Sequence, residues 1–335
     1  MGRRLIPGLE PPDAALEAEI RARLEEVEEA LRKAVVAESD LLAQTAPYLI
    51  EAGGKRFRPM LVLLAGHFGD PADPRLIPGA VAIELVHAAT LYHDDVIDEA
   101  DSRHGVPSVN ARWSNTVAIL TGDYLFARAS EISSDLGPEV IALLARTIAT
   151  LCDGQIREVE ASGNVGHTVE AYLEIIRRKT GALIATSCRM GGLLSDAPPE
   201  HVALLEAYGD ALGTAFQLSD DIMDITASAE ELGKEPGVDM REGVYTLPVL
   251  LALRRGPDGA ELAALLSDGP PTEERLARAL EIVRNPRTLA EARAVVRAEV
   301  DRARSLAERL PAGPAASTLV QLAEFLAVRC GAGRP

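Results

Sequence analysis

Aromatic residues and paired cysteines are what this sequence of 335 residues most lacks. Phe, Trp and Tyr make up only 4% of the chain, although 47% of it is hydrophobic. This balance favours helices over strands, which are rich in aromatic and β-branched residues. The three cysteines (Cys152, Cys188 and Cys330) are scattered, and none belongs to a CxxC pair. The cysteine pattern therefore predicts neither a disulfide framework nor a thiolate metal site.

An excess of basic residues is also missing. The chain has 34 Lys and Arg against 51 Asp and Glu, which gives a formal net charge of −17. Such a charge argues against nucleic acid as a partner, because duplex binding needs clustered Lys and Arg. The N-terminal residues contain no apolar core of the kind that a signal peptide has, and the apolar segments are too short or too interrupted to span a bilayer. We therefore expect a cytoplasmic protein with no transmembrane segment.

Most long segments repeat apolar residues three and four positions apart, as amphipathic helices do. Segments rich in Gly and Pro separate them, and neither βαβ alternation nor a series of short alternating strands is present. The pattern predicts an all-α fold of about ten or more helices, in a single domain over residues 1–335. The predicted helical segments include residues 12–36, 79–100, 114–133, 138–162, 168–195 and 200–226, and the tail from residue 270 through residue 330 is helical again.

Two acidic motifs echo each other along the chain. "HDDVID" begins at residue 93 and "SDDIMD" at residue 219, and each closes an apolar helical stretch. In a helix, residues i and i+4 share a face, so the first and last aspartates of each motif point the same way. The middle aspartate turns aside by about 100°. The six aspartates are Asp94, Asp95, Asp98, Asp220, Asp221 and Asp224.

The acidic motifs are unfavourable for the helices that carry them. Like charges at i and i+4 destabilise a helix, and acids near its C-terminus oppose its dipole. For one motif alone, an acidic helix end in solvent is the alternative interpretation. Oxygen ligands without His or Cys suit a hard cation, and Mg²⁺ is the usual one when phosphate completes its shell. The second motif lacks the glycine and the spacing of a Ca²⁺-binding loop. Two such motifs predict a Mg²⁺ site.

Basic residues beside glycines are suited to an anionic substrate that accompanies Mg²⁺. "GGKRFRPM" places three bases after two glycines. Arg103 follows the first acidic motif, Lys179 stands in "RRKTG" and Lys234 stands in "LGKEPG". No P-loop pattern is present, so the glycine-flanked bases favour a diphosphate held in another way. The bases are Lys55, Arg56, Arg58, Arg103, Lys179 and Lys234.

Five of these segments together resemble the trans-isoprenyl diphosphate synthases, or polyprenyl synthetases. They are "GGKRFRP", "HAATLYHDDVIDEADSRHG", "RKTGAL", "FQLSDDIMD" and "GKEPGVDMREGVYTLPVL", in the family's order and at about its spacing. The resemblance covers the chain from about residue 40 to its C-terminus. It implies an all-α bundle around a central cavity, usually a homodimer. It also implies an enzyme that joins isopentenyl diphosphate head to tail with an allylic diphosphate.

The resemblance also implies roles for single residues. The six aspartates of the two motifs are the acids that hold three Mg²⁺ ions on the allylic diphosphate, directly or through water, and Asp239 is a further water-mediated partner. The residues that resemble the allylic diphosphate clamp are Arg103, Lys179 and Lys234. Those that resemble the isopentenyl diphosphate site are Gly54, Lys55, Arg58 and His87. Thr180 and Gln217 resemble the oxygen dipoles that face the allylic cation. Without the motif, His87 would be interpreted as a core histidine.

Two positions depart from the family's pattern. Arg103-His104-Gly105 stands where Arg-Arg-Gly is common, and the second arginine normally helps to hold isopentenyl diphosphate. His104 can do so only when protonated and lacks the fixed fork of arginine, so we expect weaker or more pH-sensitive isopentenyl binding. Val244 stands where a lysine is frequent, which removes one expected diphosphate contact.

The residues before the first motif bear on product length. In the family, bulky aromatics four and five residues before the first aspartate block growth at short products, and here those positions hold Thr90 and Ala89. Small residues about one helical turn below the acids therefore favour a long product, about C30 to C50 and suited to a quinone side chain. A farnesyl or geranylgeranyl diphosphate synthase is the alternative.

Two other protein classes fit the sequence less well. A class I terpene cyclase has an Asn/Ser/Glu pattern in place of the second aspartate motif, and it needs no isopentenyl site. A silent partner subunit of a heteromeric synthase tends to lose its acids, and both motifs are intact here.

Overall fold

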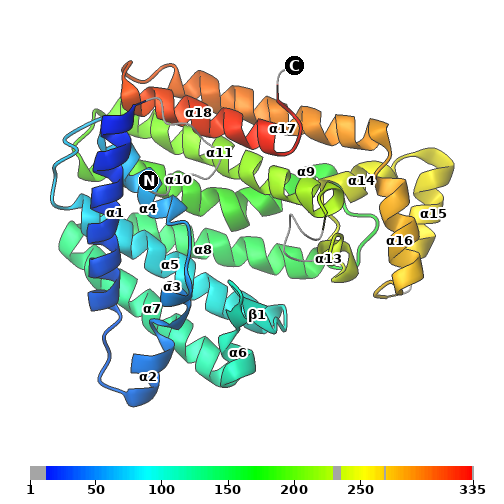
Figure 1. Cartoon of the computed structure of the whole chain (residues 1–335), viewed down its shortest axis with the longest axis horizontal. Coiled ribbons are helices and arrows are strands. Elements are labelled where there is room, and N and C mark those ends of the chain that lie inside the picture. The colour runs from blue at the N-terminus through cyan, green and yellow to red at the C-terminus, as the bar shows by residue number, and fades with distance from the viewer. Residues whose placement is uncertain (1–12, 229–234, 268, 334–335) are drawn as a thin grey trace. The chain divides into compact units, whose positions relative to one another are not determined.

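The structure is a computed structural model that describes residues 13–228, 235–267 and 269–333. Within these ranges the regular secondary structure is helical apart from one short strand pair, so the all-α prediction is confirmed (Figure 1). The elements up to residue 161 are α1 (Ala14–Ala34), α2 (Asp40–Thr45), α3 (Tyr48–Ala52), α4 (Phe57–Gly66), α5 (Leu76–Ile97), β1 (Ser102–Arg103), β2 (Val106–Pro107), α6 (Val109–Arg112), α7 (Asn115–Leu136) and α8 (Pro138–Ala161). The later elements are α9 (Val169–Ile176), the π-helical turn η1 (Arg177–Gly181), α10 (Ala182–Leu194), α11 (Pro199–Thr226), α13 (Val238–Arg241), α14 (Leu247–Leu253), α15 (Gly256–Leu266), α16 (Glu273–Val283), α17 (Pro286–Ala307) and α18 (Pro314–Arg329).

Contacts group the chain into two compact units. The first unit comprises Met1–Ile148, Leu183–Glu206 and Leu310–Thr318. The second unit comprises Ala149–Ala182, Ala207–Arg309 and Leu319–Pro335. The first acidic motif belongs to the first unit and the second acidic motif to the second. A single domain over residues 1–335 stays a prediction.

Helix α5 forms the core of the first unit and packs against α7, α4 and α1. It is apolar on nearly every face, and each fully buried Val, Leu or Ile of the core contributes about 1.5–3 kcal/mol. It begins at Leu76, earlier than the predicted residue 79, because a proline such as Pro78 is tolerated in the first helical turn. Among the described residues, α5 alone is long and apolar enough to cross a membrane, and 67% of its apolar window is buried inside the protein.

A two-stranded antiparallel hairpin follows α5, which the sequence pattern did not predict. Ser102 pairs with Pro107 and Arg103 with Val106. The two turn residues, His104 and Gly105, have φ values of 52° and 79°. Positive φ at both central residues is the geometry of the tight hairpin turn whose twist matches that of the strands. The hairpin folds the chain back after the first acidic motif and returns Arg103 to Asp95 of α5.

In the second unit, α11 carries the second acidic motif in its last two turns. The Tyr208 hydroxyl of α11 donates to the Leu319 carbonyl of α18 over 2.7 Å and ties the two helices together. The segment predicted as one helix over residues 168–195 is interrupted by η1. A π turn inserts one extra residue into the helical repeat and is frequent at functional sites, and this one contains the "RKTG" motif.

Candidate functional site

The first acidic motif closes α5 with one buried and two more exposed aspartates. Asp94 is half-buried and Asp98 is exposed, whereas the side chain of Asp95 is fully buried. Arg103 donates to Asp95 Oδ1 from Nε over 2.7 Å and from Nη2 over 2.6 Å. Burial raises the pKa of the Asp95 carboxyl, although the charge of Arg103 acts in the opposite direction. Asp95 Oδ2 is buried and has no hydrogen-bond partner among the described residues.

The "GGKRFRP" motif forms the turn before α4. Gly53 and Gly54 have φ values of 130° and 148°, which side chains with a Cβ rarely adopt. A Cβ on Gly54 would lie 2.5 Å from Arg56 Nη1, so the glycine makes room for that guanidinium. Arg56 is itself buried, donates to the Ile50 carbonyl over 2.6 Å and forms an ion pair with Glu84 over 3.1 Å. Arg56 therefore organises the turn.

Positive charge converges on His87 of α5. Burial holds the pKa of His87 well below its usual value, and nearby positive charge lowers it further. The groups that supply this charge are Arg58, His104, Arg56 and Arg103. Arg58 Nε is buried and has no hydrogen-bond partner among the described residues. Arg58 and His104 are thus close enough to His87 to act on its pKa, and their shared role in binding a substrate stays a prediction.

The remaining predicted residues of the first unit lie nearby on the same elements. Lys55 is exposed, just ahead of α4. His104 is exposed at the hairpin turn, where partial burial and then the charge of Arg103 lower its pKa. Ala89 is fully buried in α5, and Thr90 is half-buried with its hydroxyl donating to the His87 carbonyl over 2.8 Å.

The second acidic motif differs from the first in how its acids are held. Asp220 is half-buried and forms an ion pair with Arg329 at the end of α18, with Nη1 2.5 Å from Oδ1. Asp221 and Asp224 are buried, with 2% and 4% of their surfaces exposed. Asp239 is half-buried in α13. A buried carboxylate is costly unless donors or a cation meet it, and Tyr172 and Gln217 both donate to Asp221.

The "RKTG" motif is placed by the π turn between α9 and α10. Lys179 forms an ion pair with Glu158 of α8. A Cβ on Gly154 of α8 would lie 2.7 Å from the Lys179 backbone nitrogen, so that glycine admits the π turn. The Thr180 hydroxyl donates to Gln217 Oε1 over 3.0 Å, which brings together the two predicted oxygen dipoles. Lys234, predicted as a further clamp residue, lies outside the described residues.

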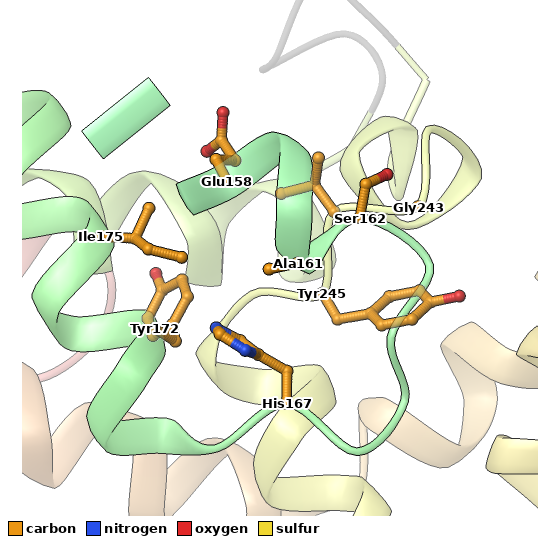
Figure 2. A pocket seen from close by; sticks show the side chains of 9 residues that line it. Glu158, Ala161, Ser162, His167, Tyr172, Ile175, Gly243 and Tyr245 are labelled. Atoms are coloured by element: carbon orange, nitrogen blue, oxygen red, sulfur yellow. The ribbon is translucent and has the colours of Figure 1, made fainter. Parts of the chain in front are cut away.

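A pocket in the second unit is lined in part by Glu158, the ion-pair partner of Lys179 in this motif. It encloses about 330 Å³, part of it open solvent, and Glu158, His167, Tyr172 and Tyr245 contribute to its lining. Figure 2 shows the imidazole of His167 directed towards Tyr172, while the hydroxyl of Tyr245 points away from both. The pocket therefore lies next to two side chains that contact the site: Glu158 pairs with Lys179, and Tyr172 donates to Asp221.

The donor set fits Mg²⁺ that arrives with a diphosphate. In the described parts of the chain, no three acidic, histidine or cysteine side chains gather closely enough to hold a metal by themselves. Mg²⁺ usually keeps several waters and takes one or two carboxylates plus substrate phosphates. The buried Asp95 Oδ2 without a hydrogen-bond partner is suited to such a use.

Three side chains of the site were not found from the sequence. They are Glu158, Tyr172 and Arg329, each of which contacts a predicted residue from a different helix. One signal was present for Tyr172, because a tyrosine in the apolar stripe of a helix usually needs a hydrogen-bond partner. Glu158 and Arg329 have no comparable signal, since charged residues of this kind are common on helix surfaces.

Comparison with known proteins places the chain among enzymes of isoprenoid synthesis. A sequence model of the polyprenyl synthetase family matches residues 39–283. The chain is 41% identical over 329 residues to a nonaprenyl diphosphate synthase of Mycobacterium tuberculosis, which covers 98% of each protein. Its structure matches a decaprenyl diphosphate synthase of Rhodobacter capsulatus, with a TM-score of 0.87 at 35% identity over 94% of this chain and 98% of that one.

A second solved structure is equally similar. It is a geranylgeranyl pyrophosphate synthase of Corynebacterium glutamicum complexed with calcium and isoprenyl diphosphate. The TM-score is 0.86 at 41% identity, over 97% of this chain and 100% of that one.

Proposed function

The chain belongs to the polyprenyl synthetase family, whose members are Mg²⁺-dependent trans-prenyltransferases, and we propose that it makes a long all-trans polyprenyl diphosphate. In the proposed reaction, isopentenyl diphosphate is added repeatedly, head to tail, to an allylic diphosphate. A long product, about C30 to C50, is supported by the similarity to nonaprenyl and decaprenyl diphosphate synthases. Such a product is suited to the side chain of a quinone.

The observation that carries this proposal is the positive charge around His87. Arg58 has a buried Nε without a hydrogen-bond partner in the described chain, and its counter-charge Glu84 already binds Arg56. A guanidinium in this state is suited to bind a diphosphate, whose oxygens match its fork of donors. We assign isopentenyl diphosphate to this site, with Lys55, Arg58, His87 and the Gly54 backbone as its contacts.

The second unit offers the groups suited to the allylic diphosphate. Lys179 is held by Glu158, and in the proposed function it turns to the diphosphate. We assign Lys234, which lies outside the described residues, to the same ligand by its motif. Bound Mg²⁺ would supply the charge that neutralises the departing diphosphate. The aspartates of the two motifs and Asp239 would bind the Mg²⁺, directly or through water, and Arg103 would bind the diphosphate. The oxygens of Thr180 and Gln217 face the allylic carbon and stabilise the positive charge that develops there.

The bond changes balance without a further reagent. The allylic C–O bond breaks and the diphosphate leaves with the electron pair. The double bond of isopentenyl diphosphate then supplies a pair to the allylic carbon, and a new C–C bond forms. A proton is lost from the neighbouring carbon to the released diphosphate, which restores a double bond and an allylic diphosphate one unit longer.

The test is incorporation of labelled isopentenyl diphosphate by the purified protein with each of several allylic primers. We expect labelled product only when Mg²⁺ and a primer are both present. Arg58→Gln should raise the KM for isopentenyl diphosphate by at least about tenfold, because hydrogen bonds to charged groups contribute about 1.5–3 kcal/mol. Arg75→Gln, which removes an arginine paired with Asp73 and Asp196, is the control and should leave that KM unchanged. No product with any primer would refute the proposal.

A geranylgeranyl diphosphate synthase is the second candidate function. It is favoured by the similarity to the enzyme of Corynebacterium glutamicum, which the chain covers completely. The small residues Ala89 and Thr90 favour the longer product. The sizes of the labelled products separate the two candidates.

Two further proposals concern the state of the enzyme in the cell. We propose a homodimer, and the exposed apolar side chains Ile119 and Leu120 of α7 support it because exposed apolar residues that lie together are typical of protein–protein contact surfaces. Light scattering at several concentrations tests this. We also propose a cytoplasmic location, supported by the family's fold and tested by cell fractionation.

A further inference from the structure

A chain of three hydrogen bonds joins α9, η1 and α11 in the second unit. The Tyr172 hydroxyl donates to Asp221 Oδ2. Gln217 Nε2 donates to Asp221 Oδ1 over 2.9 Å, and the Thr180 hydroxyl donates to Gln217 Oε1 over 3.0 Å. Tyr172 and Asp221, at one end of this chain, are deeply buried, at 5% and 2% exposed. Both oxygens of a buried carboxylate are thus held, one by the tyrosine and one by the glutamine.

The direction of each bond follows from the chemistry of Asp221. An ionised carboxylate only accepts hydrogen bonds, whereas an amide has a donating and an accepting end. Gln217 must therefore turn its nitrogen to Asp221 and its carbonyl oxygen to Thr180. Thr180 must in turn donate its hydroxyl hydrogen, which leaves its lone pairs available. Asp221 thus decides which end of Gln217 is presented to Thr180.

We infer that Tyr172 is a positioning residue for the prenyl transfer, and this inference rests on the proposed function. Its hydroxyl fixes the Asp221 carboxylate, and Asp221 keeps the oxygen of Gln217, and not its nitrogen, beside Thr180 and the allylic carbon. Without the hydroxyl, the carboxylate can rotate away from Gln217, and the amide can turn a partial positive charge towards the developing cation. Partners that orient a metal-site carboxylate have effects of this kind in other proteins.

Tyr245 provides a matched control for Tyr172. Both are buried tyrosines, at 7% and 5% exposed, and both line the same pocket (Figure 2). The Tyr245 hydroxyl donates to the Leu266 carbonyl over 3.0 Å, so it too has a hydrogen bond to lose. Replacing either residue with Phe removes one buried hydroxyl bond and keeps the ring. Only Tyr172 contacts an aspartate of the second motif.

The experiment compares Tyr172→Phe and Tyr245→Phe in the full-length protein. For Tyr172→Phe we expect kcat to fall about 10-fold to 100-fold, the range typical of lost partners behind a metal-site ligand. Mg²⁺-dependent binding of a non-reactive allylic thiodiphosphate, measured by calorimetry, should weaken by a similar factor. The KM for isopentenyl diphosphate, which depends on first-unit residues, should stay within about twofold of wild type. Tyr245→Phe should leave all three quantities at the wild-type value.

Three outcomes are distinguished. Loss of kcat and of thiodiphosphate binding in Tyr172→Phe alone supports the positioning role. Equal behaviour of the two variants, with an active wild type, overturns the inference and leaves the proposed function standing. An inactive wild type instead refutes the proposed function. Thermal unfolding of both variants shows whether a loss of folded protein accounts for any difference, and a lower Tm confined to Tyr172→Phe, with unchanged binding, counts against the role.

Discussion

Arg56 and Glu84 form a buried ion pair, with Nη1 3.1 Å from Oε1, at the foot of the proposed isopentenyl diphosphate site. Burial raises the pKa of Glu84, and the charges of Arg56 and then Arg58 act against that rise. Arg56 is thus the ion-pair partner of the carboxylate, whereas Arg58 Nε has no hydrogen-bond partner among the described residues. We do not place Arg56 against a substrate, but we expect its pairing with Glu84 to decide whether Arg58 is available to bind one.

Removing Arg56 should harm both stability and binding. Arg56→Met leaves Glu84 buried without its partner, which costs about 3–5 kcal/mol of the free energy of unfolding. It should also raise the KM for isopentenyl diphosphate, because Arg58 is then drawn to Glu84. Urea unfolding and steady-state kinetics measure the two effects. The double variant Arg56→Met with Glu84→Leu removes the stranded charge and should regain most of the stability. A double variant no more stable than Arg56→Met contradicts this account.

The ion pair between Arg329 and Asp220 places a protein cation on an aspartate that we assign to Mg²⁺. Arg329→Gln should therefore lower the Mg²⁺ concentration that gives half activity. The expected factor is about two- to fivefold, since partly exposed ion pairs contribute about 0.2–1 kcal/mol. Mn²⁺ binding followed by electron paramagnetic resonance should strengthen by the same factor. Arg278→Gln, which removes exposed pairs with Glu261 and Glu281, is the control. A higher Mg²⁺ requirement in Arg329→Gln is the contrary result.

His104 should make isopentenyl binding depend on pH. Partial burial and the charge of Arg103 lower its pKa below the usual value near 6.5, so the imidazole loses its proton as the pH rises towards neutrality. The attraction for diphosphate is lost with the proton. The KM for isopentenyl diphosphate should therefore increase as the pH rises from about pH 5 to about pH 7, with little further change above that. His104→Arg keeps its charge throughout and should give a lower and flatter KM. Identical profiles for the two proteins would show that His104 does not contribute.

An aromatic ring at position 89 should shorten the product. Ala89 is fully buried and lies about one helical turn before the first aspartates, and under the proposed function a Phe there blocks the path of the growing chain. Chromatography of the products of Ala89→Phe should show a shift to fewer prenyl units. Leu91→Phe adds a similar ring about 200° further round α5 and should leave the length unchanged. An unaltered product from Ala89→Phe would place the length-determining wall elsewhere.

The sequence predicted well those features that depend on short-range residue patterns, such as the helical repeat and the family's motifs. The all-α fold and membership of the polyprenyl synthetase family are confirmed. The helical repeat also predicted that the middle aspartate of each motif turns aside from its neighbours. In the structure Asp95 and Asp221 are buried, at 0% and 2% exposed, but Asp224, the last aspartate of the second motif, is buried as well, at 4%. Roles of the single site residues stay predictions, to be decided by the variants described above.

Contacts between helices were beyond the sequence pattern. The pair of Glu158 with Lys179 depends on how far α8 is shifted along η1, and helical periodicity carries no information on such a shift. The π turn at Lys179 adds a residue that changes which side chains share a face. The hairpin at residues 102–107 was missed because its turn, His104-Gly105, differs from the Asn-Gly and Asp-Gly pairs that mark most such turns.

The most direct test of the central claim is the size of the product made by the wild-type enzyme. The purified protein is incubated with Mg²⁺, labelled isopentenyl diphosphate in excess and an allylic primer, and the dephosphorylated products are separated by chain length. We predict a main product between about C30 and C50, as for the nonaprenyl and decaprenyl enzymes to which the chain is similar. Products confined to C15 or C20 would contradict the account.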